Sequence, residues 1–359
     1  MSHWLFRRSQ EAAECDPEQN NTSYSTKGDY GLAVLNEPED GAEVVADIVF
    51  IHGLTGNRET TWTNLKPKIF WPRDLLPSTL PKARIITYGY DADVIGFMSV
   101  SMNRIGNHAQ DLVSKLADLR DTTNTSERPI LFVAHSLGGL LCEDTLLLSK
   151  NSHESHLQRI VECTRGIAFM GTPHCGADKA KWGSVLAHLT YAIKTTNTSI
   201  VDILKPDSEV LARIQQEFAA MLQVRRDKGL PKMEITCFFE SLPYKVMVGE
   251  IVPRHSAILL GSTPRSIRAD HVNMTKFEGP QDDGYKSVST VLWRWARQLE
   301  EPPAPATPGR SAAAAAATRQ SWASPTSGGV YTQGGSTYSG QVNVAGGGHV
   351  HQGNVMNTR

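Results

Sequence analysis

One serine stands at the kind of turn that exposes a nucleophile. The apolar run Pro129–Ala134 is typical of a buried strand, and the spacing over Leu137–Leu148 is typical of a helix. Ser136 lies between them, with the small residues Ala134 and Gly138 two positions before and after it. Small residues are needed because the strained turn brings the strand and helix backbones together beneath the serine. The pattern predicts a nucleophile at Ser136, although alanine stands where glycine is usual; the alternative is an ordinary turn that contains serine.

The base that activates such a serine should be a late histidine. A serine hydroxyl is a weak nucleophile until an imidazole accepts its proton. Where this turn occurs, the chain order is serine, then acid, then histidine. His271 fits, because the amphipathic stretch Tyr285–Leu299 follows it as a closing helix. His255 is the other late candidate, but it lies too close to the preceding strand.

The third member is a carboxylate that orients the imidazole and stabilises its cation. Glu240 is the expected acid, because it comes directly after the predicted late strand Glu234–Phe239. Asp178 follows an earlier strand and is the alternative. Asp270 ranks third, because the side chains of sequence neighbours such as Asp270 and His271 usually diverge.

Two backbone amides are expected to stabilise an oxyanion. The N–H of Leu137 opens the helix after Ser136, at the positive end of its dipole. The N–H of Leu54 lies in the segment His52–Gly56, whose glycines let amides turn inward after an early strand. We expect His52 to be structural rather than catalytic.

The elements that must position these groups alternate between apolar runs and amphipathic stretches over residues 29–300. The strands expected besides those already named are Ala46–Ile51, Ala83–Tyr88 and Gly166–Met170, and a further helix is Asn103–Arg120. The alternation predicts an α/β-hydrolase fold, a mostly parallel sheet with helices on both faces. Residues 178–230 read as helical, either a cap insertion over the site or a plain outer helix pair.

Composition excludes several other classes of protein. The 359 residues have a net charge of −1 with scattered Lys and Arg, which argues against nucleic-acid binding. The five cysteines are far apart without a metal-binding spacing, so we expect reduced thiols, no metal and no cofactor. Neither a signal peptide nor an apolar window of about 18 residues is visible. We therefore expect a cytoplasmic protein.

The two ends of the chain differ from the middle. Residues 1–28 are polar and are expected to be flexible, and residues 301–326 read as a linker rich in proline and alanine. Within residues 327–359, three similar segments recur: Ser327–Val330, Ser339–Val342 and Gln352–Val355. Their uncharged Asn and Gln could ladder in stacked copies, so we expect a disordered, amyloid-prone tail.

The hydrolase motifs together resemble a family of α/β-hydrolases. It includes the mammalian mitochondrial serine-active-site proteins, the glycosyl-phosphatidylinositol inositol-deacylase group and fungal SesB-like hydrolases. The matching pieces are His52–Leu54 with Trp62, Thr87–Tyr90, His135–Gly139, Phe169–His174, Phe238–Glu240 and Ala269–Met274. The resemblance implies hydrolysis of esters or lipid esters, and it favours Glu240 over Asp178.

The tail resembles the amyloid signalling motifs of fungal innate-immunity proteins. That resemblance implies self-assembly through residues 327–359, templated by a nucleotide-binding receptor with a matching motif. The hydrolase would then be an effector of cell death or incompatibility, recruited to membranes whose lipids it attacks. Two alternatives remain: a house-keeping lipid esterase with an inert flexible tail, and a non-catalytic scaffold that has kept the fold.

Overall fold

The computed structural model describes residues 30–39, 43–92, 103–176, 178–194, 208–244 and 249–300. The predicted N-terminal segment 1–28, the linker 301–326 and the tail 327–359 lie outside these residues. No helix in the described ranges combines the length and the apolarity that a membrane crossing requires. The four cysteines within them, which are Cys142, Cys163, Cys175 and Cys237, are free and buried, as predicted.

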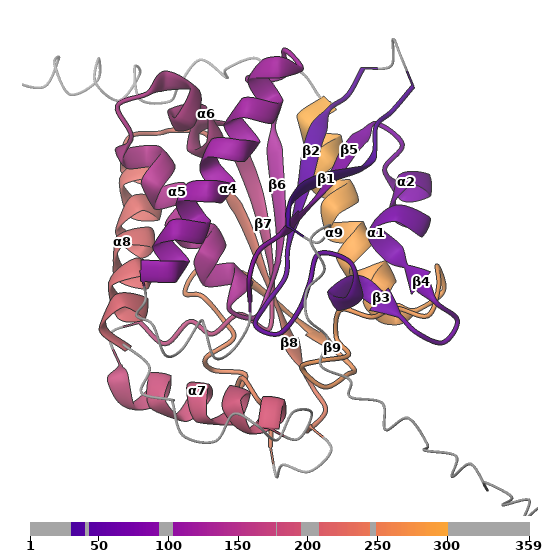
Figure 1. Ribbon diagram of the computed structural model, residues 1–359, viewed down its shortest axis with the longest axis vertical. Helices are drawn as coiled ribbons and strands as arrows, with labels where there is room; N and C mark the ends of the chain where they lie inside the picture. Colours follow the sequence, from indigo (N-terminus) through magenta and orange to yellow (C-terminus); the bar gives the residue numbers. More distant parts are fainter. Residues whose placement is uncertain are drawn as a thin grey trace, which may run out of the picture. The chain divides into compact units, whose positions relative to one another are not determined.

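One seven-stranded sheet organises the described chain (Figure 1). Its strands are β1 (Gly31–Asn36), β2 (Ala46–Ile51), β5 (Ala83–Gly89), β6 (Ile130–His135), β7 (Thr164–Met170), β8 (Glu234–Glu240) and β9 (Thr263–Ile267). Their order is β1-β5-β2-β6-β7-β8-β9, with β1 antiparallel to β5 and all other pairs parallel. The protein has the α/β-hydrolase fold that its sequence predicts.

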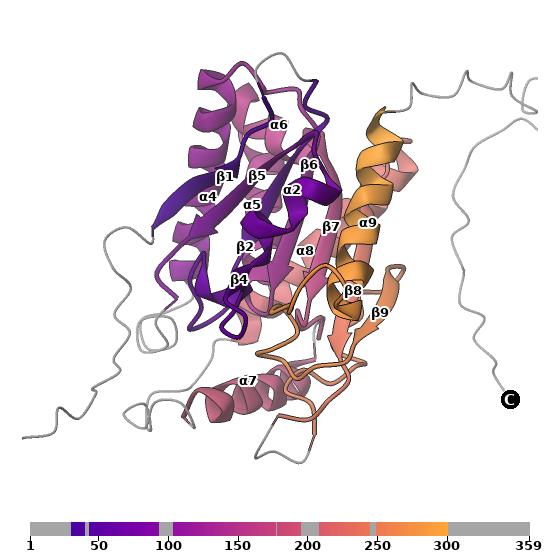
Figure 2. The same cartoon turned by 90° about the vertical axis from the view of Figure 1, so that its right-hand side faces the viewer.

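Helices cover both faces of the sheet (Figures 1 and 2). The first face packs against α4 (Asn103–Thr122), α5 (Gly138–Asn151), α6 (Ser155–Cys163) and α8 (Ser208–Asp227); the second packs against α1 (Trp71–Asp74), α2 (Leu76–Thr79) and α9 (Asp283–Glu300). Every residue of β2 is buried, and its side chains alternate between the two cores, with Val49 in one and Phe50 in the other. A strand that is covered on both faces in this way is expected to be apolar along nearly its whole length.

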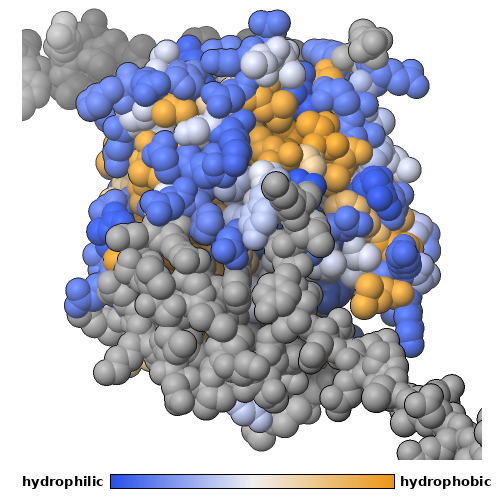
Figure 3. Space-filling view, viewed as in Figure 1, coloured by the Kyte–Doolittle hydropathy of each residue, from blue (hydrophilic) through white to orange (hydrophobic). Residues whose placement is uncertain are grey.

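Smaller elements complete the fold. The turn η1 (Thr60–Trp62) leads into a hairpin of β3 (Thr63–Asn64) and β4 (Ile69–Phe70). Apolar side chains gather in Figure 3 where β1 lies in Figure 1, and Val34 of this edge strand is 44% exposed. The edge thus differs from β2, β5 and β6, in which every residue is buried.

The helical stretch expected at 178–230 contains two helices with different surroundings. The helix α7 (Lys179–Lys194) lies beyond the end of the sheet at which the parallel strands finish (Figures 1 and 2). The helix α8 instead packs against α5 as part of the outer layer. The outer-layer interpretation of this stretch therefore applies to α8, whereas a cap formed by α7 stays a prediction.

A buried charge network lies at the end of the sheet where the parallel strands begin. Asp47, at the start of β2, is fully buried, and both its oxygens accept hydrogen bonds from the buried Arg84, at 2.8 and 2.9 Å. Arg120 from α4 donates to the same carboxylate at 2.5 Å, and Arg128 donates at 3.0 Å. Arg120 also donates to two carbonyls of the α4–β6 loop, those of Ser126 and Arg128. One carboxylate therefore joins β2, β5, α4 and this loop.

Removing this carboxylate should cost much of the stability of the domain. In Asp47→Asn, two buried guanidinium groups lose their counter-ion, so we expect the free energy of unfolding to fall by about 3–5 kcal/mol. Glu37→Gln is the matched control, because Glu37 is half exposed and lies 3.8–3.9 Å from Arg84 and Arg128. We expect it to cost less than about 1 kcal/mol. Urea unfolding measures both, and equal losses would contradict a special role for Asp47.

Candidate active site

The candidate site lies where the strand order reverses. From β2 the chain runs to β5 on one side and then to β6 on the other, so β2 and β6 flank a switch point. Ligands of open α/β sheets bind beyond the carboxyl ends of the strands at such a point. Ser136 directly follows β6, and the segment His52–Gly56 directly follows β2. The topology thus brings the predicted nucleophile and the predicted oxyanion loop together.

Ser136 occupies a crowded left-handed turn. Its φ is 53°, a conformation that a non-glycine residue rarely adopts, and its N–H donates to Met170 O at 2.9 Å. A Cβ at Gly138 would lie 2.1 Å from His52 O, and one at Gly53 would lie 2.7 Å from the Ser136 Cβ. Only glycine fits at these two places, as the predicted turn requires.

Three predicted residues form a continuous chain of contacts. His271 Nε2 is 3.0 Å from Ser136 Oγ, and His271 Nδ1 is 2.6 Å from Glu240 Oε2. The other Glu240 oxygen accepts the N–H of Val252 at 3.0 Å. The exposures of Ser136, His271 and Glu240 are 2%, 3% and 1%. This is the arrangement in which an imidazole can take a proton from a hydroxyl while a carboxylate fixes its tautomer.

The alternative residues lie elsewhere. Asp178 pairs with Lys181 at 3.4 Å and accepts the N–H groups of Ala180 and Lys181 at the start of α7. Asp270 accepts hydrogen bonds from the backbone of Val272 and from Asn273. The structure therefore places Glu240 against the imidazole, rather than Asp178 or Asp270.

The two predicted oxyanion amides have no competing acceptor. Among the described residues, no hydrogen bond engages the N–H of Leu54 or of Leu137. The loop that holds Leu54 is fixed by His52, whose Nε2 accepts the N–H of Tyr90 at 3.2 Å. His52 Nδ1 must then carry the proton, and it contacts Gly53 O at 3.0 Å. The Tyr90 hydroxyl donates to His52 O at 2.9 Å, so His52 shapes this loop structurally.

His135 is a member of the site that sequence reasoning did not single out. Its Nε2 is 3.0 Å from His271 O, and its ring lies 5.0 Å from the His271 ring. Burial and the neighbouring His271 lower the pKa of His135 well below its usual value, so it is a neutral donor. Its position next to Ser136 was the available signal. The turn thus holds both the ring of His271, through Ser136, and its backbone, through His135.

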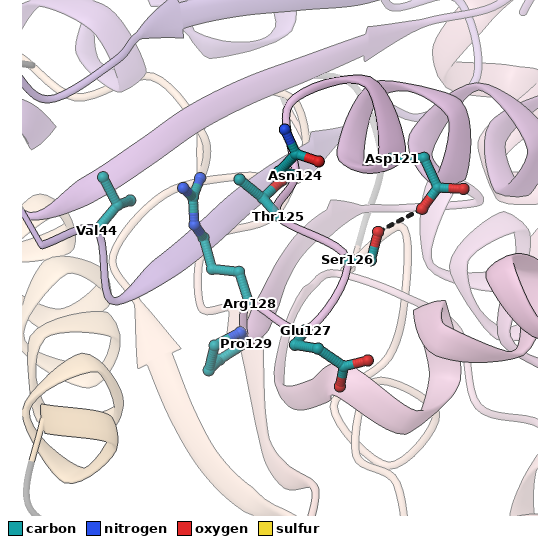
Figure 4. Close-up of a pocket in the computed structure, with 8 residues that line it drawn as sticks. All are labelled: Val44, Asp121, Asn124, Thr125, Ser126, Glu127, Arg128 and Pro129. Atoms are coloured by element: carbon teal, nitrogen blue, oxygen red, sulfur yellow. Dashed lines mark hydrogen bonds between the residues drawn. The ribbon is translucent and has the colours of Figure 1, made fainter.

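Other cavities lie away from this site. The depression in Figure 4, of about 480 Å³, is lined by Val44 and Pro129, which precede β2 and β6, and by residues 121 and 124–128. It therefore lies at the amino ends of the strands, opposite Ser136. Its Ser126 hydroxyl donates to Asp121. Within the described residues, no cluster of His, Cys, Asp or Glu is suited to hold a metal ion.

The chain is similar to known proteins. The family described as "Putative serine esterase (DUF676)" matches residues 46–256. Protein SERAC1 from Danio rerio is 27% identical over 68% of this chain and 38% of its own length. Protein SERAC1 from Homo sapiens is 27% identical over 65% and 36%. The chain thus spans little more than a third of these relatives.

Solved structures of hydrolases also align with the chain. A thermophilic esterase from Thermogutta terrifontis aligns with a TM-score of 0.40 and 14% identity, over 75% of this chain and 94% of its own.

The neutral state of His135 predicts a pH dependence of stability. Below about pH 6.5 the unfolded chain protonates this imidazole and the native state does not, so stability falls as the pH falls. His135→Gln keeps an N–H donor for His271 O but cannot gain a proton. When the pH falls from 7 to 5, the free energy of unfolding of the parent should fall by up to about 2 kcal/mol more than that of the variant, as measured by urea unfolding. His255→Gln, at an exposed histidine, is the control. If the difference in free energy of unfolding between the parent and His135→Gln is the same at pH 7 and pH 5, this assignment is contradicted.

Proposed function

The chain belongs to the family described as putative serine esterases (DUF676), and on that premise we propose that it hydrolyses carboxylic esters, including lipid esters, through an acyl-enzyme. The observation that supports this most is the contact chain from Ser136 through His271 to Glu240. Its distances fit proton transfer from the hydroxyl to the imidazole, with the carboxylate positioned behind it.

Acylation begins with attack of Ser136 Oγ on the ester carbonyl. His271 Nε2 takes the hydroxyl proton and then delivers it to the leaving alcohol. Glu240 stays ionised and stabilises the imidazolium that forms between these two transfers. The N–H groups of Leu54 and Leu137 are the donors for the oxyanion, since no described residue engages them.

Deacylation repeats the same steps with water. His271 takes a proton from the attacking water and returns it to Ser136 Oγ as the tetrahedral intermediate collapses. Because the site is buried, its few dipoles act with little solvent screening. The neutral His135 matters here, because a second positive charge beside His271 would oppose formation of the imidazolium.

We further propose that the tail decides when this hydrolase acts. Residues 327–359 lie outside the described residues, so this proposal rests on their three similar segments and on the absence of Asp, Glu, Lys and Arg from residues 327–358. Assembly templated by a nucleotide-binding receptor would gather the hydrolase at membranes, where it would promote cell death. An inert flexible tail on a house-keeping lipid esterase is the competing proposal. A non-catalytic scaffold is less well supported, because it would not need all three residues of the contact chain.

Active-site labelling tests the proposed chemistry. A fluorophosphonate probe should label the intact protein at Ser136 and should not label Ser136→Ala. Glu240→Gln should lower kcat on p-nitrophenyl esters by about 10³–10⁴-fold, because the imidazole loses its orienting anion. Asp178→Asn is the matched control and should change kcat by less than about twofold, since Asp178 lies at the exposed start of α7. An intact, folded protein that does not label would exclude the esterase.

A fibril assay tests the proposed role of the tail. The full chain should form fibrils that bind thioflavin T, and a chain ending at residue 326 should not. Val342→Pro tests the same point with a single substitution, because proline removes a hydrogen bond of a strand ladder. This variant should assemble more slowly than the full chain and keep its esterase activity. Equal thioflavin-T signals from the full and the shortened chain would contradict the proposal.

A further inference from the structure

A second buried group of ionisable side chains takes no part in the proposed hydrolysis. His174 follows β7, Glu143 lies on α5 and Cys237 lies on β8. His174 Nδ1 is 3.4 Å from Glu143 Oε1, and His174 Nε2 is 3.8 Å from Cys237 Sγ. Glu143 and Cys237 are fully buried, and the His174 side chain nearly so. The thiol faces Nε2 and the carboxylate faces Nδ1, in the same sense as Ser136 and Glu240 around His271.

Glu143 explains why this imidazole should be charged. Among the described residues, no hydrogen-bond donor reaches either of its carboxylate oxygens. A buried carboxylate without donors is strongly unfavourable unless a cation lies beside it. Burial alone would lower the pKa of His174, but its contacts with Cys237 and Glu143 outweigh burial and raise the pKa to about 9. These two contacts favour the cation of His174, while the amide Nε2 of Gln215 lies 3.3 Å from Nδ1 and burial raises the pKa of Glu143.

The imidazolium in turn favours ionisation of Cys237. Burial opposes the thiolate, but the hydrogen bond and charge of His174 overcome it and lower the pKa of Cys237. The N–H of Leu259 adds a second donor, at 3.5 Å from Cys237 Sγ. Cys142 provides a contrast, since it is equally buried and lies beside Glu143, and burial raises its pKa well above the usual value. Two thiols of equal burial thus have pKa values shifted in opposite directions.

A surface turn contacts the buried Cys237 sulfur. Leu259, which donates to the sulfur, begins this turn, and the next residue, Leu260, is 98% exposed. Gly261 follows with a φ of 84°. Residues 259–262 precede β9, so the turn can open without breaking a strand pair. A local opening of this turn would expose the sulfur to a small reagent without global unfolding.

We propose that Cys237 is a modification site, a thiolate held by His174 that reduces hydroperoxides and becomes a sulfenic acid. The thiolate electron pair attacks the nearer peroxide oxygen, an S–O bond forms and the O–O bond breaks. The sulfur is oxidised by two electrons and the peroxide is reduced. The departing alkoxide or hydroxide takes a proton, which the adjacent His174 imidazolium can supply. The site is independent of the esterase proposal.

Site-resolved oxidation of the native full-length chain tests this site. The protein is treated with limiting hydrogen peroxide and dimedone at pH 6.5 and pH 8, and each cysteine is quantified by peptide mass spectrometry. Cys237 should react before Cys142, and its rate should fall by less than about threefold between pH 8 and pH 6.5. A thiol with an ordinary pKa of about 8.5 would lose about 25-fold over that range.

Variants identify the cause of that reactivity. His174→Gln should restore the steep pH dependence, lowering the rate at pH 6.5 by about tenfold, because the amide cannot supply a positive charge. Glu143→Gln is a second variant that can be used if His174→Gln does not fold. It should also lower the rate of Cys237 oxidation at pH 6.5. Ser136→Ala should leave the reaction of Cys237 unchanged, which separates this proposal from the esterase.

Two results would overturn the assignment. The first is oxidation of Cys237 only at the rate of Cys142, which would mean that both report global unfolding. The second is a parent protein in which Cys237 shows the pH dependence of an ordinary thiol.

Discussion

The backbone segments beneath Ser136 approach one another so closely that they determine where the groups of the site can lie. The carbonyl of His52 leaves no room for a Cβ at Gly138, and Ser136 keeps a left-handed conformation against the end of β7. Such strain persists only where the surroundings over-determine it. Here β6 is paired on both sides, with β2 and β7 in parallel register. The direction of the Ser136 hydroxyl is therefore a property of the sheet, and the segments that hold Leu54 and Leu137 leave the neighbouring strands β2 and β6.

Three of the buried imidazoles show how their surroundings set the protonation of one residue type. His135 contacts a carbonyl and another histidine, and burial keeps it neutral. His174 has a similar burial but lies between Glu143 and Cys237, so its cation is favoured. His271 has a carboxylate on one nitrogen and a hydroxyl on the other, which is the pairing that proton transfer needs. Neither the residue type nor burial distinguishes these roles; the partners do.

The sequence allowed the central elements to be predicted, because their signals are local. The strands β2 and β6 are covered on both faces, so each appears as a continuous apolar run. The edge strand β9 was missed because Thr263–Ile267 is partly exposed and contains a proline, and β1 was missed for its half-exposed pattern. Chain order selected His271, its place after a late strand favoured Glu240 over Asp178, and the distance to His271 then identifies Glu240 as the partner of the imidazole. The contact of His135 with a carbonyl 136 positions later depends on the path of a loop, so no spacing rule could have found it.

The strand β2 shows how stability and the site occupy opposite ends of one sheet. At its start, Asp47 gathers arginines from β5, α4 and the loop before β6 into one buried network. After its end, His52 and Gly53 crowd against the turn at Ser136. The hydrogen bonds of Asp47 at one end join β2 to β5 and to the loop before β6, and the register of these strands keeps the strained turn in place at the other end. The network can thus support the site without contacting it. The residues at the carboxyl ends of the strands, such as Ser136 and Glu240, then need not contribute to stability and can serve chemistry.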